Sequence, residues 1–253
     1  MNVLVTGGGT IAPIDAVRHI ANASSGAFSA AITEACLDRG ADVWHLHTPR
    51  AQLPLLRHSV VGPAELDAGW MLDETFLNRA FDLLDRWKIH RRRLRLIGLD
   101  EGTIDEYAMV LEMLLRSQPF DVVFLAMAVS DYAPVAARGK LESAAEEWSL
   151  VLKKQPKIIA RVRDWAPDIY LVGFKLMTEV APAHLVAIAE QACRANRADA
   201  TIANDLALYR AGKHTIHLVR PDQPAETIGP DPQLASKVVD LIWKYADQRR
   251  NSR

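Results

Sequence analysis

The sequence has little cysteine, almost no net charge and no long apolar run. Its 253 residues include two cysteines, Cys36 and Cys193, and carry a formal net charge of −1. Two thiols are too few for a disulfide scaffold or a four-cysteine zinc site, so we expect both to be reduced packing residues. A balanced charge gives no indication of a nucleic-acid or membrane partner.

Segments that direct a chain to a membrane are also missing. No apolar stretch reaches the ~18–20 residues that a membrane-spanning helix requires. The chain opens directly on the strand-like "MNVLVTG", without the charged and apolar regions of a signal peptide. We therefore expect a cytoplasmic protein with no membrane anchor.

Strand-like and helix-like segments alternate along nearly the whole chain. The run "NVLVTGGGT" predicts a buried strand and a tight loop, residues 25–39 predict an amphipathic helix, and "ADVWHLHT" predicts a second strand. Further buried strands are predicted at "FDVVFLAMAVSDY", "DIYLVGFKL" and "DATIAND". This alternation, without repeats or linkers, predicts one doubly wound, Rossmann-like α/β domain over residues 1–253 with a mainly parallel sheet. Residues 134–158 and a late hairpin in "HTIHLVRPD" and "AETIG" are expected to form a small flap or dimerisation extension.

Four predicted strands end in polar or glycine-rich tips: "TGGGT", "AVSDY", "GFKLMTE" and "AND". Because ligands of open α/β sheets bind at the carboxyl ends of the strands, we expect these tips to converge. Gly8 and Gly9 would let backbone N–H groups approach a phosphate closely, with a plain tight turn as the alternative. The dinucleotide pattern G-x-G-x-x-G is not met, since its last position is Ala12.

The next polar segment, "NASSG", precedes the first predicted helix. Ser24, Ser25 and Gly26 are suited either to cap the helix or to bind an anion there, and the same donors serve both purposes. Asn22 offers a neutral amide that can donate to a reactive acyl-phosphate without attacking it. Its alternative role is that of an ordinary turn residue.

Charged candidates lie further along the chain. Lys140, in "ARGKLES", could neutralise a triphosphate or simply be solvated. Lys154 and Lys157 flank Pro156 and form either an electropositive rim or a solvated face. Asp131 could contact a ribose, a base or a metal ion, or cap a helix. No His, Cys, Asp or Glu cluster has metal-ligand spacing, so no metal site built from protein ligands is expected.

These motifs, in this order, resemble those of the phosphopantothenate–cysteine ligase family. The stretch "VTGGGTIAPIDAVRHIANASSG" is similar to the bacterial pattern VTxGGTxEPIDxVRxIxNxSSG, and "LAMAVSDY", "GK", "KKQPKII", "GFKLMTE" and "IAND" follow in register. The middle of the chain looks more like the eukaryotic, stand-alone enzymes. The resemblance covers nearly the whole sequence.

The resemblance implies a two-step ligation in coenzyme A biosynthesis. The carboxylate of 4'-phosphopantothenate and ATP or CTP, accompanied by Mg²⁺, would give an acyl-nucleotidylate and pyrophosphate. The amine of cysteine would then attack, giving 4'-phosphopantothenoylcysteine. Members of the family are homodimers in which substrate contacts can cross the interface.

The resemblance also assigns roles to residues. Asn22 would handle the acyl-nucleotidylate with Arg18 beside it, and Lys140 would serve the first half-reaction. The remaining matched positions concern the nucleotide: its phosphates would be bound by Gly8, Gly9, Ser24, Ser25 and Gly26, and its nucleoside surrounded by Ala128, Asp131 and Phe174.

Several positions depart from the bacterial pattern. The family's glutamate in "GFKLMTE" is replaced by Met177, and the lysine pair of CTP-using enzymes falls on Ala192 and Asn196. Arg194 or Arg197 could substitute for that pair. These departures favour ATP over CTP. They also leave room for a diverged paralogue that takes another acid or amine.

Two other classes of function stay open at this point. One is a non-catalytic nucleotide-binding paralogue, such as the regulatory subunit of a separate decarboxylase. The other is an NAD(P)-dependent oxidoreductase of the short-chain type.

Overall fold

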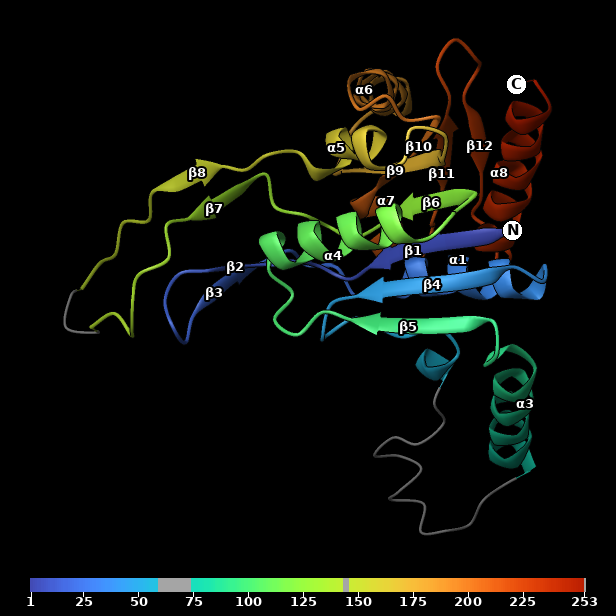
Figure 1. Ribbon diagram of the computed structural model, residues 1–253, viewed down its shortest axis with the longest axis horizontal. Helices are drawn as coiled ribbons and strands as arrows, with labels where there is room; N and C mark the ends of the chain where they lie inside the picture. Colours follow the sequence, from blue (N-terminus) through green and yellow to red (C-terminus); the bar gives the residue numbers. More distant parts are fainter. Residues whose placement is uncertain (59–73, 143–145, 253) are drawn as a thin grey trace.

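An eight-stranded sheet forms the centre of the molecule (Figure 1). The computed structural model describes residues 1–58, 74–142 and 146–252. The sheet has the order β12-β11-β10-β9-β6-β1-β4-β5, and its six strands from β10 to β5 pair in parallel. The strands are β1 (Asn2–Gly7), β4 (Asp42–His47), β5 (Leu94–Gly98), β6 (Val122–Leu125), β9 (Tyr170–Met177), β10 (Ala200–Asp205), β11 (Ile216–Val219) and β12 (Glu226–Ile228). The predicted α/β class with a mainly parallel sheet is confirmed.

The parallel strands follow the order 3-2-1-4-5-6 when they are numbered along the chain. Successive strands are added toward one edge of the sheet from β1 to β5, and toward the other edge from β6 to β10. The switch between these two directions lies between β1 and β6, which pair directly in parallel. In doubly wound sheets, ligands bind in the crevice outside the carboxyl ends of the strands at this switch point. The topology thus directs the search for a site to the loops that follow β1 and β6.

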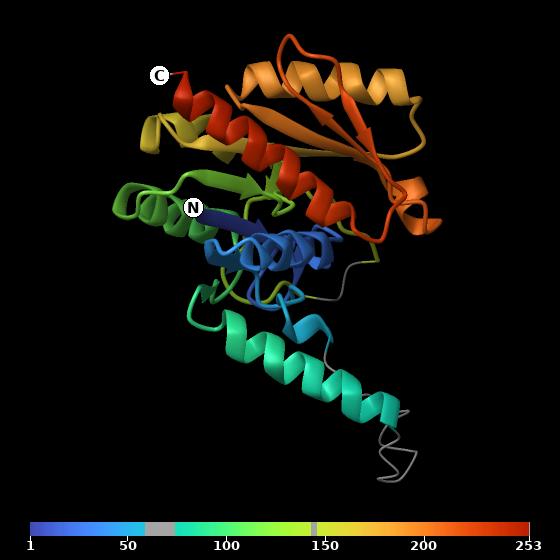
Figure 2. The same cartoon turned by 90° about the vertical axis from the view of Figure 1, so that its right-hand side faces the viewer.

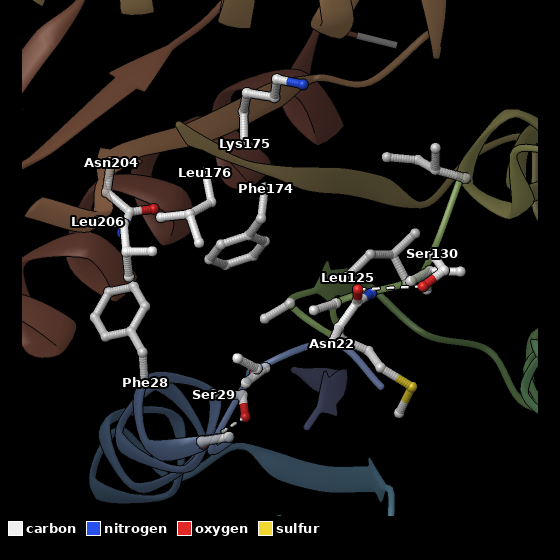
Figure 3. A pocket seen from close by; sticks show the side chains of 18 of the residues that line it. Asn22, Phe28, Ser29, Leu125, Ser130, Phe174, Lys175, Leu176, Asn204 and Leu206 are labelled. Carbon is white, nitrogen blue, oxygen red and sulfur yellow. Dashed lines mark hydrogen bonds between the residues drawn. The ribbon is translucent and has the colours of Figure 1, made fainter. Parts of the chain in front are cut away.

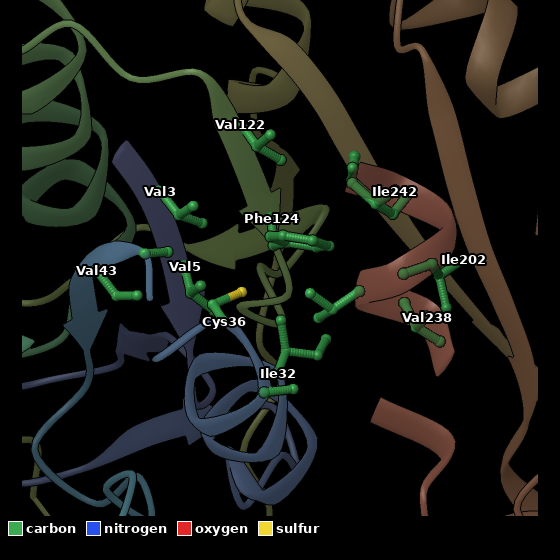
Figure 4. Packing of buried hydrophobic residues seen from close by; sticks show 14 of the residues in the cluster. Val3, Val5, Ile32, Cys36, Val43, Val122, Phe124, Ile202, Val238 and Ile242 are labelled. Atoms are coloured by element: carbon green, nitrogen blue, oxygen red, sulfur yellow. The ribbon is translucent and has the colours of Figure 1, made fainter. Parts of the chain in front are cut away.

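Helices cover both faces of the sheet (Figure 2). One face packs against α1 and α8 around a core that includes Val5, Ile32, Phe124 and Ile242 (Figure 4). The other packs against α4, α5 and α6. The helices are α1 (Ala27–Asp38), the 3-10 helix η1 (Leu56–His58), α3 (Glu74–His90), α4 (Ile104–Ser117), α5 (Ile158–Trp165), α6 (Pro182–Ala195), α7 (Leu206–Arg210) and α8 (Leu234–Asn251).

Both cysteines lie in these packed layers. Cys36 is on α1 and Cys193 on α6, and each is buried with a free thiol. Burial raises the pKa of both thiols, which keeps them protonated. The expectation of reduced packing residues is confirmed.

Two small antiparallel pairs extend beyond the carboxyl ends of the main sheet (Figure 1). The first is a hairpin of β2 (Ile11–Pro13) and β3 (His19–Ala21), and the second pairs β7 (Tyr132–Pro134) with β8 (Leu152–Lys154). We call residues 132–142 and 146–154 the arm. The predicted extension also includes residues 143–145, which lie outside the described residues.

The structure corrects two details of the sequence-based fold. The late hairpin of β11 and β12 does not belong to the extension, because β11 pairs with β10 and widens the main sheet. The helix predicted from residue 25 begins at Ala27, and the β2–β3 hairpin separates it from the glycine loop. Strands of three residues are too short to produce a recognisable alternation, so the hairpin left no clear pattern.

No helix among the described residues combines the length and apolar character needed to cross a membrane.

Candidate active site

A cavity of about 820 Å³ opens at the carboxyl edge of the sheet. Its walls come from residues 22–29, from residues 125–131 after β6, and from the ends of β9 and β10. Figure 3 shows Asn22 and Ser130 on one side of the cavity and Asn204 and Leu206 on the other. Three of the four predicted polar tips therefore supply cavity residues.

Asn22 is held in the cavity wall by three hydrogen bonds. Its side-chain Oδ1 accepts the hydroxyl of Ser130 at 3.1 Å (Figure 3). Its backbone N–H donates to the carbonyl of Thr10 at 3.3 Å, and its carbonyl accepts the N–H of Ser24 at 2.9 Å. Oδ1 is engaged as an acceptor, and the –NH₂ of the amide is the group of this side chain that can donate to a ligand.

The start of α1 faces the same cavity. Gly26 takes the N-cap position with φ 74° and has no side chain to cap the helix, and the first turn has no acidic residue. The hydroxyl of Ser25 accepts the N–H of Ala27 at 3.3 Å. Ser24, Ser25 and Gly26 line the cavity together with Phe28. The positive end of the helix macrodipole and the N–H groups of the first turn are suited to an anionic ligand.

Gly8 and Gly9 lie behind this wall and are not among the residues that line the cavity. The carbonyl of Gly8 accepts the N–H of Ala128 at 2.9 Å, and the carbonyl of Ala128 accepts the N–H of Thr10 at 3.0 Å. The loop after β1 is thus joined to the loop after β6. The loop that contains Gly8 and Gly9 therefore supports the cavity wall from outside the cavity.

Four other predicted nucleotide-site residues lie in the cavity wall. Ala128, Asp131, Lys157 and Phe174 all line it. Asp131 Oδ1 is 3.3 Å from Lys157 Nζ, and both side chains are more than half exposed. By contrast, Lys154 is exposed on β8 and does not line the cavity.

Lys140 and Arg18 lie outside the cavity of their own chain. Lys140 is exposed on the arm. Arg18 is half-buried directly before β3, where it contacts the arm. The structure therefore brings the predicted residues together in two groups: one group lies around the cavity and the other where the hairpin meets the arm.

An aromatic group at the cavity was not expected from the sequence, apart from Phe174. The ring of His214 lies 4.8 Å from those of Phe28 and Tyr209, and Phe28 lies 6.4 Å from Phe174. All four residues line the cavity. Burial lowers the pKa of His214, which favours its neutral form. These residues come from α1, β9, α7 and the loop after α7, so no local motif could have united them.

Arg210 also lines the cavity, and it was not among the site residues predicted from the sequence. It lies at the end of the short helix α7 and is exposed. A single arginine after "AND" gives no signal above the many surface arginines of this chain.

The departures from the bacterial pattern separate into two sets. Ala192 and Asn196 both line the cavity, as expected from their register. Arg194 does not replace the lysines, because it pairs with Glu190 and Asp222; nor does Arg197, which pairs with Asp164. Met177 packs with the apolar cluster around α6 and is not part of the wall.

The cavity is poor in metal ligands. Among the described residues, no group of three or more His, Cys, Asp or Glu side chains is arranged to hold a metal ion. Asp131 is the one carboxylate among the described residues of the wall. This donor set fits Mg²⁺ bound mainly by the phosphates of a nucleotide, because Mg²⁺ commonly uses one or two carboxylates and substrate oxygens.

Comparisons with known proteins identify the family of this chain. The chain matches the family described as DNA/pantothenate metabolism flavoprotein C-terminal domain over residues 1–63 and 105–245. It is 33% identical to phosphopantothenate–cysteine ligase 2 of Oryza sativa subsp. japonica, over 82% of this chain and 69% of the rice protein. A solved DNA/pantothenate metabolism flavoprotein from Streptococcus pneumoniae is 28% identical with a TM-score of 0.74, over 98% of this chain and 99% of that chain.

A longer relative matches this chain over less than half of its own length. The coenzyme A biosynthesis bifunctional protein CoaBC of Thermococcus kodakarensis is 28% identical over 87% of this chain. The chain spans 45% of that protein's length.

Proposed function

This chain belongs to the phosphopantothenate–cysteine ligase family, and from that premise we propose that it joins 4'-phosphopantothenate to cysteine in coenzyme A biosynthesis. We propose further that residues 1–253 act as one ligase domain. One observation carries the proposal: Asn22, the helix start at Gly26 and Phe174 line one cavity at the switch point of the sheet.

In the first half-reaction, the substrate carboxylate attacks the α-phosphorus of the nucleotide and pyrophosphate leaves. Ser24, Ser25, Gly26 and the first turn of α1 would bind the anionic part of the intermediate, since they line the cavity at the positive end of the helix macrodipole. The free –NH₂ of Asn22 would donate to the acyl-nucleotidylate while Ser130 fixes its orientation. Gly8 and Gly9 would act from behind the wall, by joining the loops after β1 and β6.

In the second half-reaction, the amine of cysteine attacks the acyl carbon, loses a proton and displaces the nucleoside monophosphate. The neutral amide of Asn22 suits this step because it cannot itself act as a nucleophile. Arg18 would assist Asn22 from the other end of β3, because it directly precedes this strand and Asn22 directly follows it.

The nucleotide is proposed to be ATP, with its base near Phe174, Ala128 and the aromatic rings of Phe28 and His214. The positions at which CTP-using relatives would carry lysines are occupied by Ala192 and Asn196 in this cavity. Mg²⁺ bound with the triphosphate would neutralise charge on its oxygens, and Asp131 is the wall residue suited to hold it. Lys157 and Arg210 add positive charge to the wall, and Lys154 lies further out on the arm.

We also propose a homodimer formed through the arm. Exposed apolar side chains gather there: Tyr132, Val135, Trp148, Leu150, Val151 and Leu152. Burial of such side chains against a second copy would remove them from water. Because Lys140 lies outside the cavity of its own chain, it would act in the cavity of the partner subunit.

A pyrophosphate-release assay tests the ligase proposal. ATP and CTP are each combined with 4'-phosphopantothenate, with and without cysteine. The proposal expects release of pyrophosphate with phosphopantothenate alone, faster turnover with cysteine, and a preference for ATP. If neither nucleotide gives pyrophosphate, the chain is not this ligase.

A second candidate is a non-catalytic nucleotide-binding paralogue, such as a regulatory subunit of a separate decarboxylase. The loss of the lysine pair at Ala192 and Asn196 favours it, because fewer cations then face the nucleotide. It predicts nucleotide binding without turnover. It also predicts that Asn22→Asp leaves binding nearly unchanged, whereas in a ligase this variant should stall at the acyl intermediate.

A further inference from the structure

The turn of the β2–β3 hairpin is fastened to the arm on both sides of Lys140. The carbonyl of Gly139 accepts the N–H of Ala16 at 3.0 Å. The N–H of Leu141 donates to Asp15 Oδ2 at 3.0 Å. The backbone of Lys140 is therefore tethered through both neighbours, while its side chain is exposed.

Asp15 is the centre of this junction. Its Oδ1 accepts the backbone N–H groups of Val17 and Arg18 at 2.9 and 2.8 Å. Its Oδ2 accepts the guanidinium of Arg18 at 2.6 Å as well as the N–H of Leu141. The side chain is fully buried, so these contacts take place out of water.

Arg18 contacts both limbs of the arm. Its guanidinium also donates to the carbonyl of Leu141 at 3.3 Å. The same group lies over the ring of Trp148, with Cζ 4.5 Å from the ring centroid. We call Asp15, Arg18, Leu141 and Trp148 the clasp. It links a residue beside Lys140 to the return limb of the arm.

The clasp also connects to the cavity through the hairpin. Arg18 directly precedes β3, and β3 directly precedes Asn22. The hairpin itself is held against the main body, since the N–H of Ile11 donates to the carbonyl of Gly102 at 2.9 Å. One short, hydrogen-bonded unit thus carries Asn22 at one end and positions Lys140 at the other.

Burial raises the pKa of Asp15, but hydrogen bonds from Val17, Leu141 and Arg18 lower it to about 2. The carboxylate is therefore ionised at neutral pH, and it can accept from all four donors. An asparagine of the same shape cannot do so, because one of its two positions is a donor itself.

We propose that Asp15 is a positioning residue that fixes Arg18 and the backbone of Lys140 for the first half-reaction. This inference rests on the proposed ligase function and adds to it a residue that lies outside the cavity. The inference applies whether Lys140 acts in the cavity of its own subunit or in that of a partner, because the clasp fixes the position of the Lys140 backbone on the arm.

Asp15→Asn tests the proposal, with Asp164→Asn as the matched control. Asp164 is an exposed aspartate that also pairs with an arginine, Arg197, at 3.0 Å. Two quantities are measured in each variant: the kinetics of pyrophosphate release with ATP and phosphopantothenate, and hydrogen exchange at the Leu141 amide. We expect Asp15→Asn to lower kcat by about 10- to 100-fold with the KM for ATP within about twofold, since a small misplacement of a reacting group has such effects. We expect exchange at Leu141 to quicken at least about tenfold, since its acceptor is weakened.

The two readouts separate the possible failures. If kcat stays within twofold while Leu141 exchange quickens, the clasp only stabilises the arm, and the proposal is overturned. If Leu141 exchange is unchanged, Asp15 does not hold this backbone, and the proposal is overturned as well. If the wild-type protein releases no pyrophosphate, the ligase function fails, while the exchange measurement still reports on the clasp.

Trp148→Leu is the second variant, in case Asp15→Asn does not fold. It removes the ring beneath Arg18 and leaves the buried carboxylate intact. We expect a fall in kcat of about threefold with an unchanged KM, because Arg18 loses one of its supports. An unchanged kcat in this variant would contradict the positioning of Arg18 by the arm.

Discussion

The backbone of Gly9 lies against the backbone of Asn22, so closely that a Cβ atom on Gly9 would stand 2.4 Å from the Asn22 carbonyl oxygen. Gly9 also forms a β-bridge with Ala128. The glycine therefore allows two cavity-wall segments, from the loops after β3 and β6, to meet on one residue. Its role here is close backbone packing beneath the candidate catalytic amide.

Gly9→Ala should displace Asn22 and inactivate the protein. The added methyl group meets backbone atoms, which cannot rotate away, so Asn22 must shift. We expect pyrophosphate release to fall at least about 100-fold and the free energy of unfolding to fall by about 1–3 kcal/mol. Initial-rate assays and urea denaturation measure the two effects.

Gly40→Ala is the control for this substitution. Gly40 has φ 77° at the far end of α1, and a Cβ there would have its nearest contact at 3.5 Å. It should lose about 1 kcal/mol of stability from backbone strain while activity is retained. Equal activity in the two variants would show that the Gly9–Asn22 contact does not position the amide.

Subunit complementation tests whether Lys140 acts across a dimer. Asn22→Asp and Lys140→Ala should each inactivate a homodimer. If a site takes Asn22 from one chain and Lys140 from the other, a mixed dimer retains one intact site. Random exchange makes about half of the dimers mixed, so activity should return to about a quarter of wild type.

The control for this experiment is each variant refolded alone, which should stay inactive. A mixture without activity would place Lys140 and Asn22 in the same subunit's site, or would show that the chain does not dimerise. Light scattering on the mixture distinguishes these two explanations.

The nucleotide preference should depend on Ala192 and Asn196. Both face the cavity, and lysines at these positions would place two ammonium groups beside the bound nucleotide. We expect Ala192→Lys combined with Asn196→Lys to raise the ratio of kcat/KM for CTP to that for ATP by about tenfold or more. The ratio is measured from pyrophosphate release with each nucleotide.

A matched pair of lysines outside the cavity controls for added charge. Gln191 and Ala195 are exposed on the same helix and do not line the cavity. Gln191→Lys with Ala195→Lys should leave the ratio unchanged. A similar change in both double variants would assign the effect to net charge and not to the position of the lysines.

The sequence predicted those parts of the fold and site that depend on local patterns. Buried β-prone runs such as that of β6 marked strands of the sheet, and their polar ends marked the cavity edge. The order Thr103-x-x-Glu106 is that of a capping box, and it lies at the start of α4, where the N–H of Glu106 donates to Thr103 Oγ1 at 3.3 Å. Here, local chemistry and tertiary structure agree.

Features that depend on contacts between distant segments could not be predicted. Asp15 stands in "PIDAVR" without any sign that its carboxylate accepts from Leu141, which lies 126 residues away. His214 follows a short helix, and its place between Phe28 and Tyr209 depends on the packing of α1 against the end of α7. Such residues are polar or aromatic like many others on the surface, and only the fold selects them.

Glu34 should make the stability of the fold fall in acid. Glu34 is a buried residue of α1, and its carboxylate accepts from Arg57 at 2.9 Å, from the N–H of Leu55 at 2.8 Å, and from His58 at 3.0 Å, with Arg86 also nearby. Burial raises its pKa, but these partners lower it from 4.5 to about 2. The unfolded chain therefore takes up a proton near pH 4.5 and the folded chain only near pH 2, so the stabilisation is present at neutral pH and is lost as the pH falls between these values.

Wild type should be more stable than Glu34→Gln by about 3 kcal/mol at pH 7, and this difference should shrink toward zero near pH 2. Urea denaturation at several pH values measures it, with Asp240→Asn, which breaks an exposed pair with Arg39, as a control expected to lose less than about 1 kcal/mol. A difference that stayed constant from pH 7 to pH 2 would show that the charge of Glu34 contributes nothing to folding.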